Sequence, residues 1–301
     1  MPECSPLDVT RTDLAIVLLS AVLHASWNAA AKRSREPIAF SLLMLAVNVV
    51  AGLAILPFVD FRDVTPAVWL LIGATGLTHA LYFLWLGMAY ERGDLSVVYP
   101  ISRSAPAFVT LAAIPLLGEV PSLAGALGVA VVVAGMWLVQ TDGTVRREAF
   151  TAPGMFHAYL TLAATVGYSL LDKRAMALLS ANPWHGAAPR AVVFYWLMCV
   201  ATAPLFWPAG LRTLRPGALA LVARTERRRI LGATAVGFVS YALILQALRT
   251  APVSYVVAVR QTSVLFAVLL GTTWLRERPG RLRLLGAAAT FAGVALIALR
   301  P

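Results

Sequence analysis

Charged residues are scarce in this chain. Only 13% of its 301 residues are Asp, Glu, Lys or Arg, while 59% are hydrophobic. Soluble domains usually contain about 25% charged residues. An ordinary soluble fold is therefore excluded, and the sequence predicts an integral membrane protein.

Cysteine and catalytic motifs are equally sparse. The two cysteines, Cys4 and Cys199, lie far apart, which excludes a disulfide framework or a thiolate metal site. The chain has no G-x-x-x-x-G-K-[ST] phosphate loop, no G-x-S-x-G nucleophile elbow and no H-E-x-x-H zinc helix. We expect neither an enzyme nor a nucleotide-driven pump, and no cofactor or metal.

Acidic residues number only 14 against 25 lysines and arginines, a net charge of +11. The cations are scattered over short loops and form no aromatic-studded basic face, so nucleic acid is not an expected partner. Sixteen of them fall in the loops after the first, third, fifth, seventh and ninth apolar segments, and seven in the even loops and tails. The positive-inside rule then places both termini outside the cell membrane.

Apolar segments long enough to cross a hydrocarbon core of about 30 Å recur along the whole chain. The predicted fold is an all-α integral membrane protein of ten transmembrane helices. No cleavable signal precedes the first, since Asp8, Arg11 and Asp13 lead directly into it. The predicted spans are 12–31, 37–58, 66–90, 95–117, 122–140, 153–179, 189–210, 228–249, 253–275 and 281–299.

The chain also contains an internal duplication. Residues 116–135 align without a gap to residues 274–293, so that Glu119, Pro121 and Gly128 recur as Glu277, Pro279 and Gly286. Each half, 1–141 and 142–301, then contains five spans. An odd number of crossings makes the two halves inverted repeats, an arrangement typical of secondary transporters whose site lies near the midplane between the repeats.

Two arginines lie inside predicted spans. Arg103 is roughly 12 Å deep in the fourth span and Arg260 roughly 10 Å deep in the ninth, from opposite faces. Because a cation at that depth is costly, both are predicted to face the bundle interior as site residues. The alternatives are a structural ion pair, hydrogen bonds to carbonyls freed near Pro100 and Pro106, or snorkelling.

Aromatic and amide groups accompany these arginines. Tyr99 precedes Arg103 on the same helical face, and Tyr255 and Gln261 flank Arg260. In the first span, His24, Trp27 and Asn28 share one face and are predicted to line a cavity, the alternative being an interfacial belt. The other predicted pocket residues are His79, Tyr82, Tyr241 and Tyr168, the last falling opposite Trp27 in the repeat.

The histidines and carboxylates in or near the predicted spans each have a functional and a structural interpretation. His24 and His79 suit proton coupling, although a lone histidine is more often a helix-to-helix hydrogen bond. Asp172 lies beside Lys173 and Arg174, where an interfacial ion pair is the favoured interpretation. Glu119 and Glu277 are predicted to cap the amides that begin the next span.

The segments "LHASWNAAAK", "GEVPSLAGALGVAVVVAG" and "RERPGRLRLLGAAATFAG" resemble the EamA-type branch of the drug/metabolite transporter superfamily, with Arg276 in the place of Gly118 in the second copy. The resemblance implies a substrate cavity lined by spans 1, 3, 4, 6, 8 and 9, with spans 5 and 10 as packing or dimer helices. Small residues in those two spans, Ala124 with Gly128 and Ala289 with Gly293, agree with close helix packing. The resemblance also implies cytoplasmic termini, against the cation count.

The predicted function is secondary transport of a small anionic or zwitterionic metabolite, such as an amino acid, across the cell membrane by alternating access. The partners are this small-molecule substrate and membrane lipid, and the chain is a monomer or a homodimer through spans 5 and 10. The alternatives are a passive channel, or an exporter of cationic or hydrophobic compounds. Desolvated arginines would repel a cationic substrate.

Overall fold

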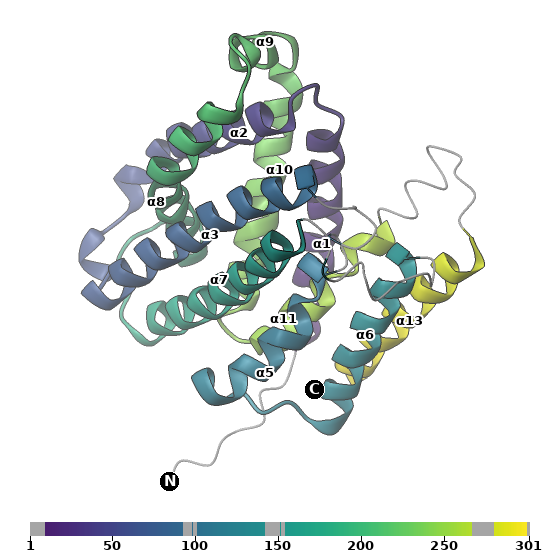
Figure 1. Ribbon diagram of the computed structural model, residues 1–301. Helices are drawn as coiled ribbons and strands as arrows, with labels where there is room; N and C mark the ends of the chain where they lie inside the picture. Colours follow the sequence, from purple (N-terminus) through teal and green to yellow (C-terminus); the bar gives the residue numbers. More distant parts are fainter. Residues whose placement is uncertain are drawn as a thin grey trace.

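The computed structural model describes residues 10–92, 98, 101–141, 151, 154–266 and 280–299, and these form a bundle of helices (Figure 1). Its longer helices are α1 (Arg11–Lys32), α2 (Pro37–Gly52), α3 (Pro66–Arg92), α5 (Ala105–Leu117), α6 (Leu123–Thr141), α7 (Met155–Ala181), α8 (Arg190–Thr213), α10 (Arg227–Ala247) and α13 (Arg281–Leu299). Shorter elements are the 3-10 helices η1 (Leu53–Phe58) and η2 (Phe61–Asp63), and the helices α9 (Ala218–Thr225) and α11 (Val253–Arg260).

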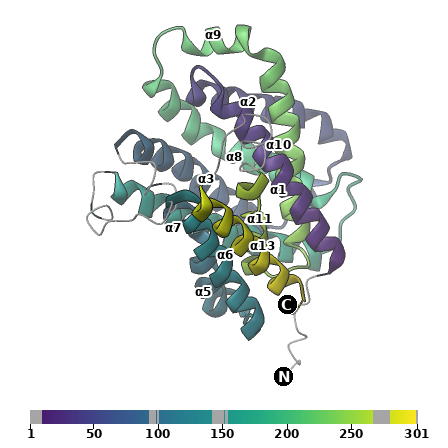
Figure 2. The ribbon, with the colours of Figure 1, turned by 90° about the vertical axis from the view of Figure 1, so that its right-hand side faces the viewer.

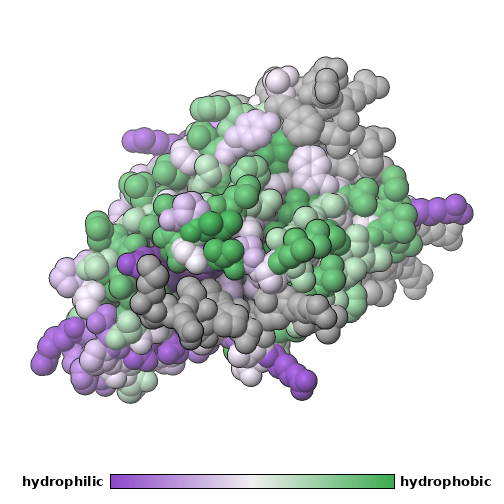
Figure 3. All heavy atoms as spheres, turned by 90° about the horizontal axis from the view of Figure 1, so that it is seen from below, coloured by the Kyte–Doolittle hydropathy of each residue, from purple (hydrophilic) through white to green (hydrophobic). Residues whose placement is uncertain are grey.

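Six helices are long and apolar enough to cross a membrane, and three apolar helices are shorter, within the described ranges. The count of ten spans stays a prediction. Large apolar side chains point outward, among them Leu70, Val120 and Leu123, each at least 75% exposed. Figure 3 shows hydrophobic residues over much of one face, with hydrophilic side chains projecting at its margins. In a bilayer such an exterior contacts lipid, and the protein is a multi-pass membrane protein.

Local sequence explains where several helices begin and end. Thr10 and Asp13 form a capping box at the start of α1, in which the Thr10 hydroxyl accepts from the Asp13 amide and the Asp13 carboxylate accepts from the Thr10 amide. Pro37 stands in the first turn of α2. Gly118 ends α5 with a φ of 70°, a left-handed conformation that favours glycine.

Two predicted spans are interrupted where continuous helices were expected. The helical residues 101–103 are separated from α5 by Ser104, and α11 ends at Arg260 before a turn at Gln261 and Thr262. Pro106, the second residue of α5, has no amide hydrogen, which favours a helix start at that point. The two interruptions lie next to Arg103 and Arg260, the arginines predicted inside the fourth and ninth spans.

The predicted second span, 37–58, is confirmed as a stretch long and apolar enough to cross a membrane; its α-helix ends at Gly52 and continues as η1, which contains Pro57. One prediction of local structure needs correction. The segment between the seventh and eighth spans, predicted as a loop, contains α9. After α9, Glu226 accepts hydrogen bonds from the Ser34 hydroxyl, the Arg35 amide and the Arg229 guanidinium, and so ties the α1–α2 connection to α10.

Helices from the two halves of the chain lie side by side. Figures 1 and 2 show α1 along α10, α3 along α7, and α6 along α13. The α6–α13 pair packs backbone against backbone at glycines. A Cβ atom on Gly128 would lie 2.8 Å from the Gly293 carbonyl oxygen, and one on Gly135 would lie 2.6 Å from that of Gly286. Gly128 and Gly293, two of the four small residues predicted for packing or dimerisation, thus contact each other's helices within one chain, and a homodimer stays a prediction.

Candidate functional site

The guanidinium of Arg260 lies between α1 and α10. Its Nη2 is 3.2 Å from Nδ1 of His24, and its Cζ is 5.2 Å from the ring centroid of Tyr241. Its buried Nε has no hydrogen-bond partner among the described residues, and no carboxylate of those residues forms an ion pair with it. Arg260 is half-buried, and a cation removed from water without an anionic partner is a candidate for binding an acceptor.

The polar face predicted for the first span is only partly directed to this cation. His24 reaches Arg260 and meets the Trp27 ring edge to face, with centroids 5.2 Å apart. Trp27 packs against α10, where it lies 3.6 Å from the position of a Cβ on Gly237. The side-chain amide of Asn28 donates to the His24 carbonyl oxygen at 2.8 Å, within its own helix.

A second polar group adjoins Arg260 and is centred on Asp172 of α7. The carboxylate, 1% exposed, accepts from the Thr75 hydroxyl and from the Tyr241 hydroxyl, each at 2.6 Å. The Tyr241 oxygen lies 2.9 Å from Nε2 of His79. The prediction of an ion pair with Lys173 or Arg174 is wrong, because successive residues on a helix point in different directions and Asp172 faces α3 and α10.

Lys173 instead belongs to a separate cluster of hydrogen bonds at the end of the bundle. Its ammonium donates to the carbonyl oxygens of Leu248 (3.0 Å) and Ala251 (2.8 Å) and lies 3.4 Å from the Glu119 carboxylate. Glu119 also accepts from the Val253 amide at 2.8 Å. It therefore caps α11 in the other half of the chain, whereas the sequence predicted a cap on the span that follows it.

Burial raises the pKa of the Glu119 carboxyl, and the opposing effects of Lys173 and of the Val253 amide do not cancel this increase. The carboxyl is thus held in place by its partners at an electrostatic cost. Its counterpart in the repeat, Glu277, lies outside the described residues, as do Tyr99 and Pro100.

Aromatic rings form a wall beside the two polar groups. His79 stacks on Tyr168 with centroids 4.1 Å apart, and Tyr82 meets Tyr168 edge to face at 5.8 Å. On the other side, Tyr195 stacks on Tyr241 at 5.1 Å. Arg103 lies within electrostatic range of His24 and Tyr168. The aromatic and cationic residues of this wall therefore come from both halves of the chain.

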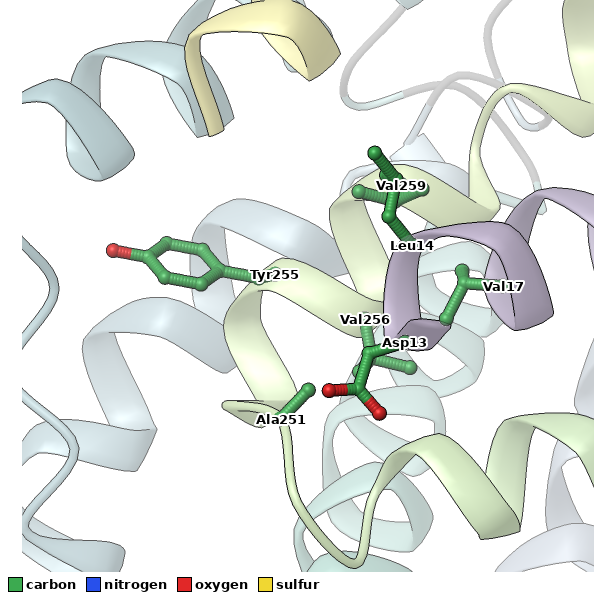
Figure 4. A pocket seen from close by; sticks show the side chains of 7 residues that line it. All are labelled: Asp13, Leu14, Val17, Ala251, Tyr255, Val256 and Val259. Atoms are coloured by element: carbon green, nitrogen blue, oxygen red, sulfur yellow. The ribbon is translucent and has the colours of Figure 1, made fainter. Parts of the chain in front are cut away.

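Two of the predicted site residues stand apart from this cluster. The Tyr255 hydroxyl accepts from the Ser122 amide at 3.2 Å, and its ring covers Gly125 of α6. Gln261 is buried, and its side-chain oxygen has no partner among the described residues. Tyr255 also borders a pocket with Asp13, Leu14 and Ala251, but Figure 4 shows its ring directed away from the Asp13 carboxylate.

That pocket has a volume of only about 10 Å³. This is about the minimum needed for one water molecule, so it cannot hold a metabolite. No group of three His, Cys, Asp or Glu side chains within the described residues is placed to bind a metal ion.

Sequence reasoning missed four members of the cluster, Thr75, Asp172, Tyr195 and Asn48, whose side-chain amide lies 3.4 Å from the Tyr195 hydroxyl. Asp172 had a usable signal, since an intramembrane carboxylate is by default a functional candidate. The others had none, because uncharged polar side chains also form hydrogen bonds between membrane helices without any role in a site.

Comparisons with known proteins agree with this architecture. The sequence model of the EamA-like transporter family matches residues 12–141 and again residues 152–299. A solved crystal structure, described only as that of a protein, has a TM-score of 0.68 and 19% identity over 97% of both chains, which supports the fold alone. No curated protein sequence matches the chain. The two family matches cover nearly the whole sequence, and the chain belongs to the EamA-like transporter family, a family of transporters and not of enzymes.

Proposed function

We propose that this protein is a secondary transporter of a small anionic or zwitterionic metabolite, such as an amino acid or a related acid, across the cell membrane. The observation that carries the proposal is Arg260, a guanidinium inside the bundle with an unpartnered Nε and no ion pair to a carboxylate of the described residues. A carboxylate or phosphonate group matches the planar fork of donors that arginine offers.

Supporting geometry comes from the residues around Arg260. His24 belongs to the first half of the chain, and Tyr241 belongs to the second half with Arg260 itself. A ligand bound to Arg260 would thus contact both halves. Relative motion of the halves would then change the exposure of the ligand, as alternating access requires.

The helix interruptions next to Arg103 and Arg260 support the same assignment. Non-helical backbone at membrane depth is tolerated where it is buried in protein or lines a cavity. In transporters, such discontinuous helices place backbone groups and helix ends at the substrate.

A passive channel and an exporter of cations are the competing functions. A carrier saturates and shows counterflow, whereas a channel does neither. For an exporter of cations, the cationic pocket is unfavourable, since Arg260 and Arg103 would repel a positively charged ligand. Purified protein in liposomes separates all three functions in one assay.

The test is a thermal-shift screen followed by counterflow, with a panel of amino acids, aminophosphonates and tetraalkylammonium ions. A selective ligand raises the apparent melting temperature in proportion to occupancy. Arg260→Gln should remove the shift caused by an acidic or zwitterionic compound, while the matched variant Arg174→Gln, at an exposed position on α7, should retain it. Non-saturating flux without counterflow, or stabilisation by cations alone, would overturn the proposal.

A further inference from the structure

We propose that Asp172, Tyr241 and His79 form a binding site for one exchangeable proton. The site adjoins the anion site assigned to Arg260 and supplies the proton for coupled transport. The coupling rests on the proposed function, whereas proton binding itself is tested without any substrate.

The argument begins with three contacts in a row. Oδ2 of Asp172 lies 2.6 Å from the Tyr241 hydroxyl oxygen, and that oxygen lies 2.9 Å from Nε2 of His79. Nδ1 of His79 lies 2.9 Å from the Thr75 carbonyl oxygen and 3.3 Å from the Thr75 hydroxyl oxygen, whose single hydrogen is donated to Asp172. Each distance in the row of three is that of a hydrogen bond, so each contact needs one hydrogen between its two heavy atoms.

Counting hydrogens shows that one is missing from the ordinary protonation states. A neutral imidazole supplies one hydrogen and the tyrosine hydroxyl supplies one, and the backbone carbonyl of Thr75 supplies none because it only accepts. Three contacts therefore share two hydrogens when Asp172 is ionised and His79 is neutral. Whichever contact lacks its hydrogen then places two lone pairs face to face.

One added proton satisfies all three contacts, in either of two arrangements. In the first, the Asp172 carboxyl is protonated and donates to Tyr241, Tyr241 donates to Nε2 of a neutral His79, and Nδ1–H donates to Thr75. In the second, Tyr241 donates to the Asp172 carboxylate, and an imidazolium donates from both nitrogens. Shifting the Asp172 proton to Tyr241 and the Tyr241 proton to His79 interconverts them with no net change in charge.

Both oxygens of the Asp172 carboxyl already have a partner in the protein. The Thr75 hydroxyl contacts Oδ1 at 2.6 Å and the Tyr241 hydroxyl contacts Oδ2 at 2.6 Å, and Asp172 forms no ion pair among the described residues. The neighbouring cation Lys173 faces Leu248, Ala251 and Glu119 instead. An acid this deeply buried, 1% exposed, is most simply satisfied by a proton.

Charges around the site link the proton to the anion. Titratable groups of the neighbouring helices surround the proton site: Arg260 from α11, Tyr168 from α7, and Tyr195 and Cys199 from α8. Farther out, His24 of α1 contacts Arg260, and Arg103 is near Tyr168. Helix α5 has no titratable residue. The Arg260 charge opposes an added proton. An anion bound to Arg260 offsets that charge, so proton and anion bind cooperatively, and the linkage is reciprocal.

Infrared difference spectroscopy of the purified protein between roughly pH 4 and pH 9 tests the site directly. Other carboxyls, Glu119 among them, can also contribute titrating bands in this range. We expect one of the titrating protonated-carboxyl bands to be missing in Asp172→Asn and to change frequency in Tyr241→Phe, which removes only the bridging hydroxyl. Asp60→Asn, at the α2–α3 connection, and Tyr159→Phe, at an exposed position of α7, should leave the band unchanged. The proposal is overturned if no titrating carboxyl band of the wild type is missing in Asp172→Asn.

Removal of the nearby charge provides a second readout. Arg260→Gln should move the midpoint of the titration to higher pH by about one pH unit, a tenfold change in proton affinity, whereas Arg174→Gln should not move it. An unchanged midpoint in Arg260→Gln contradicts the electrostatic linkage. If the band titrates as expected but no compound in the panel is transported, the proton site stands and the proposed transport function fails.

Discussion

The carboxylate of Glu119 lies 3.4 Å from the ammonium of Lys173 and accepts a hydrogen bond from the amide of Val253. Glu119 belongs to the first half of the chain, and Lys173 and Val253 to the second. Since Lys173 also holds the carbonyl oxygens of Leu248 and Ala251, these two side chains join three helix ends on one side of the bundle.

Breaking this pair should destabilise the protein strongly. Lys173→Met leaves the Glu119 carboxylate buried without its cation, and the expected loss is about 3–5 kcal/mol of unfolding free energy. The measurement is a denaturation curve in detergent. The double variant Lys173→Met/Glu119→Gln should recover part of the loss. Equal stability of the wild type and Lys173→Met would show that the contact contributes nothing.

The close contact of α6 with α13 at their glycines should not tolerate a larger side chain. Gly135→Val would place side-chain atoms where even a Cβ lies 2.6 Å from the Gly286 carbonyl oxygen, so the helices must separate. We expect a lowered melting temperature and a loss of folded protein on size-exclusion chromatography. Gly73→Val, on α3 with no atom within 4 Å of an added Cβ, is the matched control and should differ little from the wild type.

The hydrogen bonds of the Asp63 carboxylate, at the connection between α2 and α3, should make the stability of the protein depend on pH. Burial alone would raise the pKa of Asp63, but hydrogen bonds from the Gly186 amide and from the ring and amide of His185 outweigh it and lower the pKa. A carboxyl whose folded pKa is lowered contributes stability above its unfolded pKa, and this contribution is lost as the pH falls through the folded value.

In Asp63→Asn the melting temperature at neutral pH should therefore be lower, and the difference from the wild type should shrink as the pH falls below about 4. Thermal denaturation across a pH series measures this difference. Asp60→Asn, which removes a more exposed carboxylate three residues away, should show a smaller effect. A constant difference at every pH would contradict the assignment.

The cation count predicts that the connection around Arg62 faces the outside and that α9 faces the cytoplasm. Arg62→Cys in intact cells should react with a membrane-impermeant maleimide, and Arg224→Cys should react only after the membrane is permeabilised, in a background where Cys4 and Cys199 are replaced. The reverse pattern would support cytoplasmic termini, as the family resemblance implies.

Several features of the fold follow from local sequence. The length of the apolar segments predicts the helices. The capping box of Thr10 with Asp13 accounts for the start of α1, and the left-handed Gly118 accounts for the end of α5. The duplication predicts the two family matches. Asp172 was misassigned because its neighbours in sequence are cations, while its partners Thr75 and Tyr241 are 97 and 69 residues away.

By itself, the sequence determined that the chain lies in a membrane and is built from a repeat, and it predicted two arginines inside the spans. These properties depend on composition and spacing along one chain. The tertiary structure decided which polar groups meet: His24 with Arg260, Asp172 with Tyr241, and Glu119 with α11. Such contacts depend on how the helices of the two halves are rotated against each other, and hydrophobic periodicity does not specify that rotation for a helix that is apolar on nearly every side.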